Sequence, residues 1–266
     1  MKKRARILCL LVSALVVFAM FPLQATTATN YEKVFDKLKA EDVAKYVTPL
    51  PTKGAKSQSE AQINRELKKI GGKIPGNGSV LIDKTLSITA MNGVPGIAYK
   101  TTYYARKKGK NTSFYFQSEC AYTISGEYPP ANCYTTVSTS KKYTRYHWYK
   151  GESTGTYLER NGKVVWDPPT SQLGVIAKHK KMTNCKKYSD VKFMGQKCFV
   201  YSFIPEGSTS TIYIYVSRQT GQILKSVVSN PGGTTGMTIS FAYKYGSKPA
   251  SYFEKPKGIE FTYAPY

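Results

Sequence analysis

The sequence predicts an α+β fold in which two helices near the N-terminus precede a large, mostly antiparallel sheet. Between residues 31 and 71 apolar side chains recur at helical spacing. From residue 79 to 262, segments rich in Tyr, Thr, Val and Ile alternate with Gly, Pro and Asn turn signals. The 266 residues, 41% of them hydrophobic, can bury a core without metals or disulfides. We therefore expect one domain over residues 26–266.

Residues 1–25 have the pattern of a secretory signal peptide. Four basic residues precede an apolar stretch, Ile7–Phe21, and the small residues Ala25 and Ala28 follow, so that cleavage is expected after one of these two alanines. The stretch is shorter than the roughly 20 residues of a membrane-spanning helix, which makes an uncleaved anchor the less favoured alternative. We expect an exported protein that is soluble after cleavage and periplasmic or extracellular.

Two helices are expected in the segment 31–71. The first begins near Tyr31, ends at Thr48–Pro51 because proline cannot continue the hydrogen-bond ladder, and collects apolar residues on one side. These residues are Val34, Phe35, Leu38, Val43, Ala44 and Val47. The second helix is capped by Ser57 or Ser59 and ends at Gly71–Gly72. Its apolar residues are Ala61, Ile63, Leu67 and Ile70.

The predicted strands follow one another as a long meander. They are Val80–Thr89, Gly96–Arg106, Thr112–Ser118, Tyr134–Ser140, Tyr143–Tyr149, Thr156–Glu159, Val164–Trp166, Lys197–Ile204, Thr211–Ser217, Ile223–Ser229 and Thr235–Tyr245. An antiparallel sheet of this kind buries one face, and the two helices are the segments available to cover it. A strongly curved sheet with these helices packed on its concave face would form an apolar trough, which suits a ligand.

Four cysteines remain after the signal peptide, in two pairs with equal spacing. Exported chains with an even cysteine count usually oxidise them. Three connectivities are open, and we favour Cys120–Cys133 and Cys185–Cys198, each closing a segment with turn signals. A four-thiolate zinc site would show close CxxC spacing, which the sequence lacks.

The C-terminal half resembles the LolA/LolB superfamily of outer-membrane lipoprotein-sorting proteins. Three segments carry the resemblance: Tyr157–Pro168, Val191–Tyr201 followed by Ile212–Lys225 with its Thr220-Gly221 turn, and Tyr243–Gly246 through Phe253–Gly258. The resemblance implies an incomplete β-barrel wrapped around helices, with an apolar cavity for acyl chains. It covers residues 150–260 well and the N-terminal part only by element order.

On this basis we expect a non-catalytic, monomeric protein of the cell envelope that holds the acyl chains of a lipid or lipoprotein in the trough and needs no cofactor. Hydrophobic burial would supply the affinity, at ~0.8 kcal/mol per methylene. The candidate lining residues are Val34, Phe35, Leu38, Trp148, Trp166, Tyr213 and Tyr215. The alternative is a structural or interaction protein with a filled core, in which these residues only pack and a basic surface binds anionic envelope polymers.

The charge of the chain favours anionic surfaces as partners. The net charge is +23, with basic clusters at Arg106–Lys110, Lys141–Lys142, Lys178–Lys181 and Lys186–Lys187. The export signal argues against nucleic acid as a physiological partner. Neither histidine, His147 or His179, has a metal-spaced neighbour. The G-x-S-x-G match at Gly151–Gly155 lies between two predicted strands rather than between a strand and a helix, so no hydrolase site is predicted.

Overall fold

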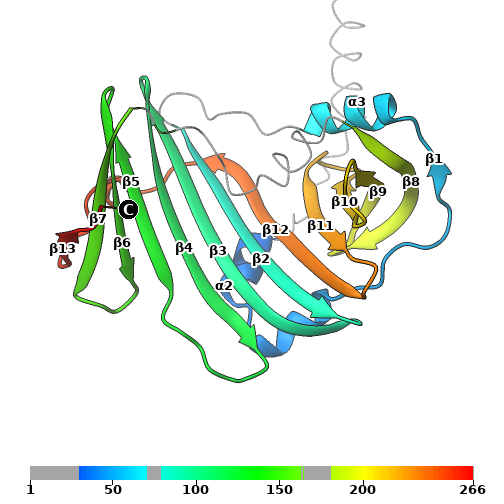
Figure 1. Ribbon diagram of the computed structural model, residues 1–266, viewed down its shortest axis with the longest axis horizontal. Helices are drawn as coiled ribbons and strands as arrows, with labels where there is room; N and C mark the ends of the chain where they lie inside the picture. The colour runs from blue at the N-terminus through cyan, green and yellow to red at the C-terminus, as the bar shows by residue number, and fades with distance from the viewer. Residues whose placement is uncertain (1–29, 71–78, 163, 165–180, 266) are drawn as a thin grey trace, which may run out of the picture. The chain divides into compact units, whose positions relative to one another are not determined.

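The computed structural model describes residues 30–70, 79–162, 164 and 181–265, and its main feature is one sheet of thirteen strands (Figure 1). In chain order the strands are β1 (Lys56–Ser57), β2 (Val80–Met91), β3 (Val94–Lys108), β4 (Asn111–Thr123), β5 (Asn132–Ser138), β6 (Lys142–Tyr149), β7 (Thr154–Asn161), β8 (Met182–Phe193), β9 (Gln196–Pro205), β10 (Thr211–Ser217), β11 (Ile223–Ser229), β12 (Thr234–Gly246) and β13 (Glu260–Tyr263).

The strands lie side by side in the order β1-β8-β9-β10-β11-β12-β2-β3-β4-β5-β6-β7-β13. The pairs are antiparallel, except that β13 runs parallel to β7. β1 and β13 are the two edges, so the sheet is curved but unclosed in the part of the chain that the structure describes (Figure 1). The prediction of a large, mostly antiparallel sheet is confirmed.

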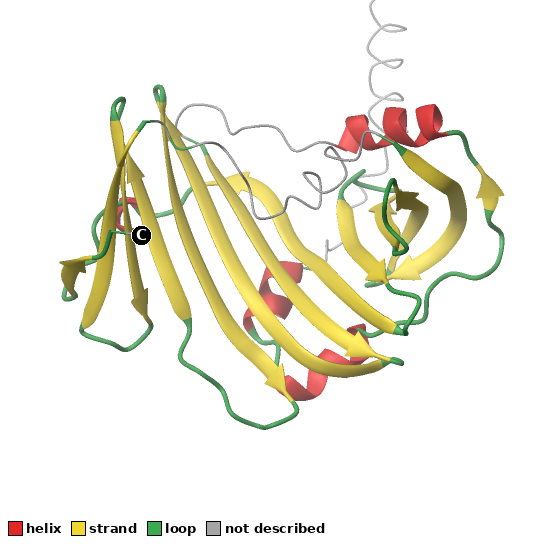
Figure 2. Cartoon of the chain, viewed as in Figure 1, coloured by secondary structure: helices red, strands yellow, loops and turns green. Residues whose placement is uncertain are grey.

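Few residues are helical (Figure 2). The helical segments are α2 (Tyr31–Asp36), η1 (Ala40–Tyr46), α3 (Glu60–Ile70) and η2 (Ala250–Phe253). The first predicted helix is therefore interrupted. The Asp42 carboxylate accepts a hydrogen bond from the Lys39 backbone N–H at 3.1 Å and starts a new, 3-10 helical segment there.

The second helix begins where the sequence predicts it. Ser59 Oγ accepts from the Gln62 backbone N–H at 3.2 Å, and Gln62 Oε1 accepts from the Ser59 N–H at 2.9 Å. This reciprocal pair caps α3 and satisfies N–H groups that have no partner within the helix.

Two apolar clusters cover opposite faces of the strands β9 and β10. On β9, Cys198 and Val200 belong to a cluster with Phe35, Leu38 and Val43 of the α2–η1 segment. The alternate residues Tyr201 and Phe203 belong to a second cluster, which contains Ile63 of α3. Because successive side chains of a strand point to opposite faces, α2–η1 and α3 pack on different faces of the sheet. The expectation that both helices pack on one face is therefore wrong, and that either of them covers the concave face stays a prediction.

Three strands, β1, β8 and β13, were not predicted, and one predicted strand is not formed at its described residue. Register shifts after Thr183 and Tyr188 interrupt the alternation of β8, and β13 exists as a strand through its pairing with β7. Val164 lies outside any strand. Lys163, Trp166, His179 and the predicted signal peptide lie outside the described residues.

The predicted disulfide Cys120–Cys133 is wrong, since both thiols are free. Cys133 pairs with Gln117 of β4, and Cys120 lies three residues farther along that strand with no register shift between them. An odd separation places Gln117 and Cys120 on opposite faces. The two sulfur atoms therefore lie on different sides of the sheet.

The predicted disulfide Cys185–Cys198 is also wrong, since these thiols are free as well. Lys186, next to Cys185, pairs with Ser202, which is four residues from Cys198. This offset corresponds to about 13 Å along the strand, well beyond the ~7 Å between Cα atoms that a disulfide tolerates. The two side chains also enter different apolar clusters.

Candidate functional site

A groove of about 390 Å³ lies between the segment that follows η1 and the strands β11 and β12. Its lining residues are Val47, Thr48, Pro49, Leu50, Gly93, Val227, Thr235 and Met237. The walls are mostly aliphatic, and the two polar side chains are threonines. A mostly apolar cavity of this size, with a few polar groups, is typical of a small-molecule site.

The groove exists because the chain after η1 is held on the sheet without being helical. Val43 of η1 is fully buried and anchors the segment in the same cluster as Met237 and Val227. Pro49 and Pro51 prevent the helix from continuing. Val47 and Leu50 pack only partly against the cluster, so they leave one side of the groove open.

The floor of the groove is a row of cross-strand partners. Val227 of β11 pairs with Tyr213 of β10 on one side and with Met237 of β12 on the other. Directly opposite residues of an antiparallel pair share a face and contact each other. Tyr213 is therefore placed next to the groove floor, although its ring is only partly buried.

The next row of the same face contains Lys225, a charged residue with no exposed surface. Its Nζ donates a hydrogen bond to Thr48 Oγ1 at 2.6 Å and lies 5.2 Å from the ring centres of both Phe193 and Tyr215. In the described part of the chain no carboxylate forms an ion pair with it. Burial without a counter-ion lowers the pKa of this amine to about 8.

Tyr215 is the cross-strand partner of Lys225 and is 1% exposed. Its hydroxyl has no hydrogen-bond partner among the described residues. Burial raises the pKa of this phenol well above its usual value, so the group stays protonated and remains a donor. An ammonium and a hydroxyl thus occupy one row of an otherwise apolar sheet face.

The residues predicted to line a trough are distributed over several places. Phe35, Leu38 and Tyr215 are buried members of the cluster beneath the groove, and Tyr213 packs against it. Val34 is 36% exposed, on the other side of α2. Trp148 lies on β6 in a separate aromatic group with Tyr115 and Phe261. Trp166 lies outside the described residues.

Sequence reasoning did not single out Lys225 or the segment 47–50. The alternation of β11 places Lys225 and Val227 on one face, but alternation does not say which face is buried. The presence of one lysine in a strand is ordinary. Only the packing of η1 and the following prolines shows that this lysine is enclosed.

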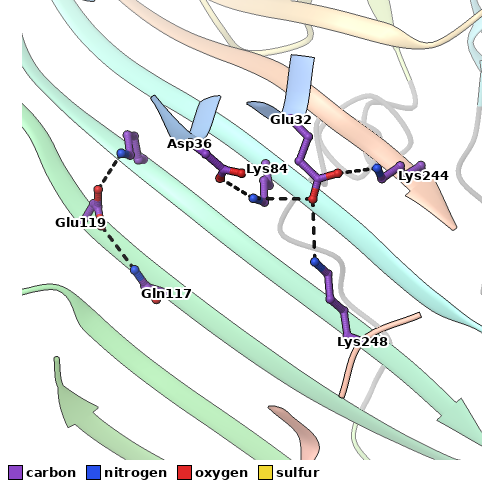
Figure 3. Close-up of polar contacts among 8 residues, drawn as sticks. Glu32, Asp36, Lys84, Gln117, Glu119, Lys244 and Lys248 are labelled. Atoms are coloured by element: carbon purple, nitrogen blue, oxygen red, sulfur yellow. Dashed lines mark hydrogen bonds and ion pairs between the residues drawn. The ribbon is translucent and has the colours of Figure 1, made fainter. Parts of the chain in front are cut away.

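A group of ion pairs fixes α2 to the sheet (Figure 3). Lys84 of β2 lies 2.5 Å from Asp36 and 3.6 Å from Glu32, and Glu32 also pairs with Lys244 and Lys248. Burial opposes the ionisation of Glu32, but the hydrogen bond from Lys244 and the surrounding lysines outweigh it and lower its pKa. The network holds Phe35, next to Asp36, in the apolar cluster.

The described residues contain no group of three or more His, Cys, Asp or Glu side chains arranged to hold a metal ion. His147 Nε2 lies 2.7 Å from Asn132 Oδ1, and burial lowers its pKa. In the same part of the chain, no helix has the length and apolar character needed to cross a bilayer.

No family model matches the chain, and no curated protein matches it. Among solved structures, the MucA/MucB complex of Pseudomonas aeruginosa matches with 12% identity over 67% of this chain and a TM-score of 0.34. This chain covers 56% of that one. An outer-membrane lipoprotein-sorting protein domain from Vibrio parahaemolyticus matches with 10% identity over 72% of this chain and 94% of its own length, with a TM-score of 0.27.

A LolA superfamily protein from Nitrosomonas europaea matches with 7% identity over 75% of this chain and 99% of its own length, with a TM-score of 0.24. The matching structures therefore include members of the superfamily that the sequence resembles. At these identities and scores the likeness is distant.

Proposed function

We propose that this chain is an exported, non-catalytic binding protein of the cell envelope that holds an acyl chain in the groove between residues 47–50 and strands β11 and β12. The observation that carries the proposal is the groove itself, with about 390 Å³ of space over an apolar floor formed by Val227 and Met237. Each methylene removed from water contributes ~0.8 kcal/mol, so a chain of modest length gains substantial affinity.

The groove is also suited to one chain rather than several. Its volume lies near the lower end of the range of ligand sites, roughly 300–1,000 Å³. Phe35, Leu38 and Tyr215 are packed core rather than free walls. We therefore propose a narrower acyl-chain site than the trough predicted from the sequence. It lies beside Phe35, Leu38 and Tyr215 and is not lined by them.

The test is ligand binding by the exported full chain after removal of copurified lipid. Native mass spectrometry with palmitate, methyl palmitate and hexadecanol should show one bound ligand per protein. Thr235→Trp should weaken all three by at least tenfold, because Thr235 lines the groove and the indole would fill it.

Thr234→Trp is the matched control. Thr234 is the next residue of β12, points to the other face and pairs with the exposed Met91. Binding should stay within twofold of the wild type. Absence of binding to any acyl compound by the wild type, or equal binding by both tryptophan variants, would contradict the proposal.

A second candidate is a structural or interaction protein with a filled core and a basic surface. The dense packing of Phe35 and Leu38 favours it, as does the charge of +23, with Lys108, Lys110, Lys141 and Lys142 exposed. It predicts salt-sensitive binding to anionic polymers such as lipoteichoic acid or lipopolysaccharide. Such binding, unchanged by Thr235→Trp and without acyl binding, would support this candidate instead.

A further inference from the structure

The buried amine of Lys225 is a feature near the groove that an aliphatic ligand does not explain. Removing a charged group from water is strongly unfavourable unless a counter-ion or hydrogen bonds compensate for it. Lys225 has no exposed surface, and Thr48 Oγ1 is its hydrogen-bond acceptor. An ammonium has three N–H donors, so Thr48 Oγ1 alone does not satisfy all the donors of Lys225 Nζ.

Thr48 connects the amine to the groove, although Lys225 itself is not one of the lining residues. Thr48, which accepts the hydrogen bond from Nζ, is itself a lining residue. Val227, two residues from Lys225 on the same face of β11, forms the groove floor. A ligand head that displaces Thr48 Oγ1 from Nζ would therefore contact the Lys225 amine.

A second unused donor occupies the same row. Tyr215, opposite Lys225 in the register of β10 and β11, is buried, and its hydroxyl has no partner among the described residues. The polar groups of this row are thus two donors, an ammonium and a phenol, and they lack a negatively charged acceptor. A carboxylate or phosphate supplies several acceptor oxygens and a compensating charge.

We infer that Lys225, with Tyr215 as a second donor, binds the anionic head of a single-chain lipid whose acyl chain lies in the groove. The inference rests on the proposed function and specifies its ligand: an acyl chain that ends in a carboxylate or a phosphate. The head enters first, and the chain extends outward over Val227 and Met237.

Exposed lysines elsewhere on the chain do not provide the same selectivity. Hydrated charges at a surface are screened by water and salt, whereas an ion pair in a low-dielectric site is much stronger. The enclosed amine therefore discriminates between a charged head and a neutral head of the same length. The exposed lysines favour a charged head over a neutral one much less strongly than the enclosed amine does.

The experiment compares charged and neutral ligands on delipidated, exported full chain by isothermal titration calorimetry. Palmitate and hexadecyl phosphate carry the two anionic heads, and methyl palmitate is the neutral reference. The wild type should bind at least one of the anionic ligands tenfold or more tightly than methyl palmitate. The preferred head identifies the source, a fatty acid or a phosphorylated lipid.

Lys225→Met should abolish that preference and leave methyl palmitate binding within about twofold. Lys225→Arg keeps the charge and should retain the preference at least in part, and Tyr215→Phe should reduce it several-fold. If Lys225→Met does not fold, Lys225→Arg and Tyr215→Phe test the inference, since each keeps the bulk of the original side chain. Loss of the preference in Lys225→Arg, or an unchanged preference in Tyr215→Phe, would then contradict it. A wild type without preference for an anionic head, or a preference that survives in Lys225→Met, would overturn the inference.

These outcomes separate the inference from the proposed function. If the wild type binds palmitate, hexadecyl phosphate and methyl palmitate equally and Thr235→Trp loses this binding, the proposed acyl binding is supported. The inference about Lys225 is then overturned. Absence of binding by all three ligands removes both.

Discussion

The strands β9, β10 and β11, here called the inner strands, differ sharply from β6, β7 and β13, the outer strands. Most residues of the inner strands are buried, and β9 and β10 have an apolar cluster on each face. None of the described residues of the outer strands is fully buried. Their aromatic side chains contact one another instead, as in the edge-to-face pair of Tyr146 and Phe261, whose centroids lie 5.0 Å apart.

The difference shows that strand alternation does not determine burial. Tyr157 in the outer strands and Tyr215 in the inner strands both lie on predicted strands, yet only Tyr215 is enclosed. A polar group in the inner strands lies in a low-dielectric environment, where an unpaired charge strongly lowers the stability of the folded chain. The same group in the outer strands remains in contact with water.

The largest expected effect is on stability in the inner strands. Phe203→Ala removes a ring with no exposed surface and should lower the free energy of unfolding by about 3–5 kcal/mol. Tyr157→Ala in β7 should lower it by only about 1 kcal/mol, because Tyr157 is only partly buried. Urea unfolding measures both variants. Equal losses would mean that the two regions are packed alike.

Lys225→Met should raise the free energy of unfolding by about 2 kcal/mol at pH 7 in the absence of ligand. It replaces a buried amine without a counter-ion by an apolar side chain of similar length. The measurement is urea unfolding of delipidated protein. A loss of stability would show that the amine is compensated within the free chain, which would weaken the case for an anionic ligand.

The stability difference between wild type and Lys225→Met should also depend on pH. Burial lowers the pKa of Lys225 to about 8, below the ordinary value of 10.5, so the unfolded chain binds more protons between these two values. This contribution therefore makes the wild type more stable as pH rises from about 8 to 10. The advantage of Lys225→Met should shrink over this range. A difference that is constant with pH would contradict the assignment.

A smaller effect is expected from the ion pairs. Glu32→Gln leaves the nearly buried Lys84 with Asp36 alone and should cost about 1–2 kcal/mol at pH 7. Because the pKa of Glu32 is lowered in the folded chain, its contribution is present above the ordinary pKa and is lost as pH falls through the folded one. Lys142→Gln, in an exposed pair with Glu159, should change stability by less than about 0.5 kcal/mol.

The smallest effect concerns thiol reactivity, which should follow burial. Burial raises the pKa of Cys198 to about 11 and also raises that of Cys133, so neither is an effective thiolate near pH 8. Cys120 is partly exposed and should react first with Ellman's reagent, at least tenfold faster than the buried thiols. When the chain is unfolded without reductant, the thiols of all four cysteines should react with Ellman's reagent. Resistance of a pair to the reagent after unfolding would indicate a disulfide.

Much of the sheet could be predicted from the sequence, because β-branched and aromatic alternation is a local property. The segments Thr211–Ser217 and Ile223–Ser229 coincide with β10 and β11. Ser59 as the cap of α3 is equally local. The candidate site could be predicted only in part, since Tyr213 and Tyr215 lie beside the groove, whereas Thr48 and Lys225 were not selected.

The sequence by itself determined where strands and turns form and which residues alternate along them, because these depend on side-chain shape over a few neighbours. The tertiary structure decided the register that separates the cysteine pairs, the edge position of β13 and the enclosure of Lys225. Thr48 and Lys225 are 177 residues apart in the chain. A contact over that separation is fixed by how the whole core packs, and no local pattern contains that information.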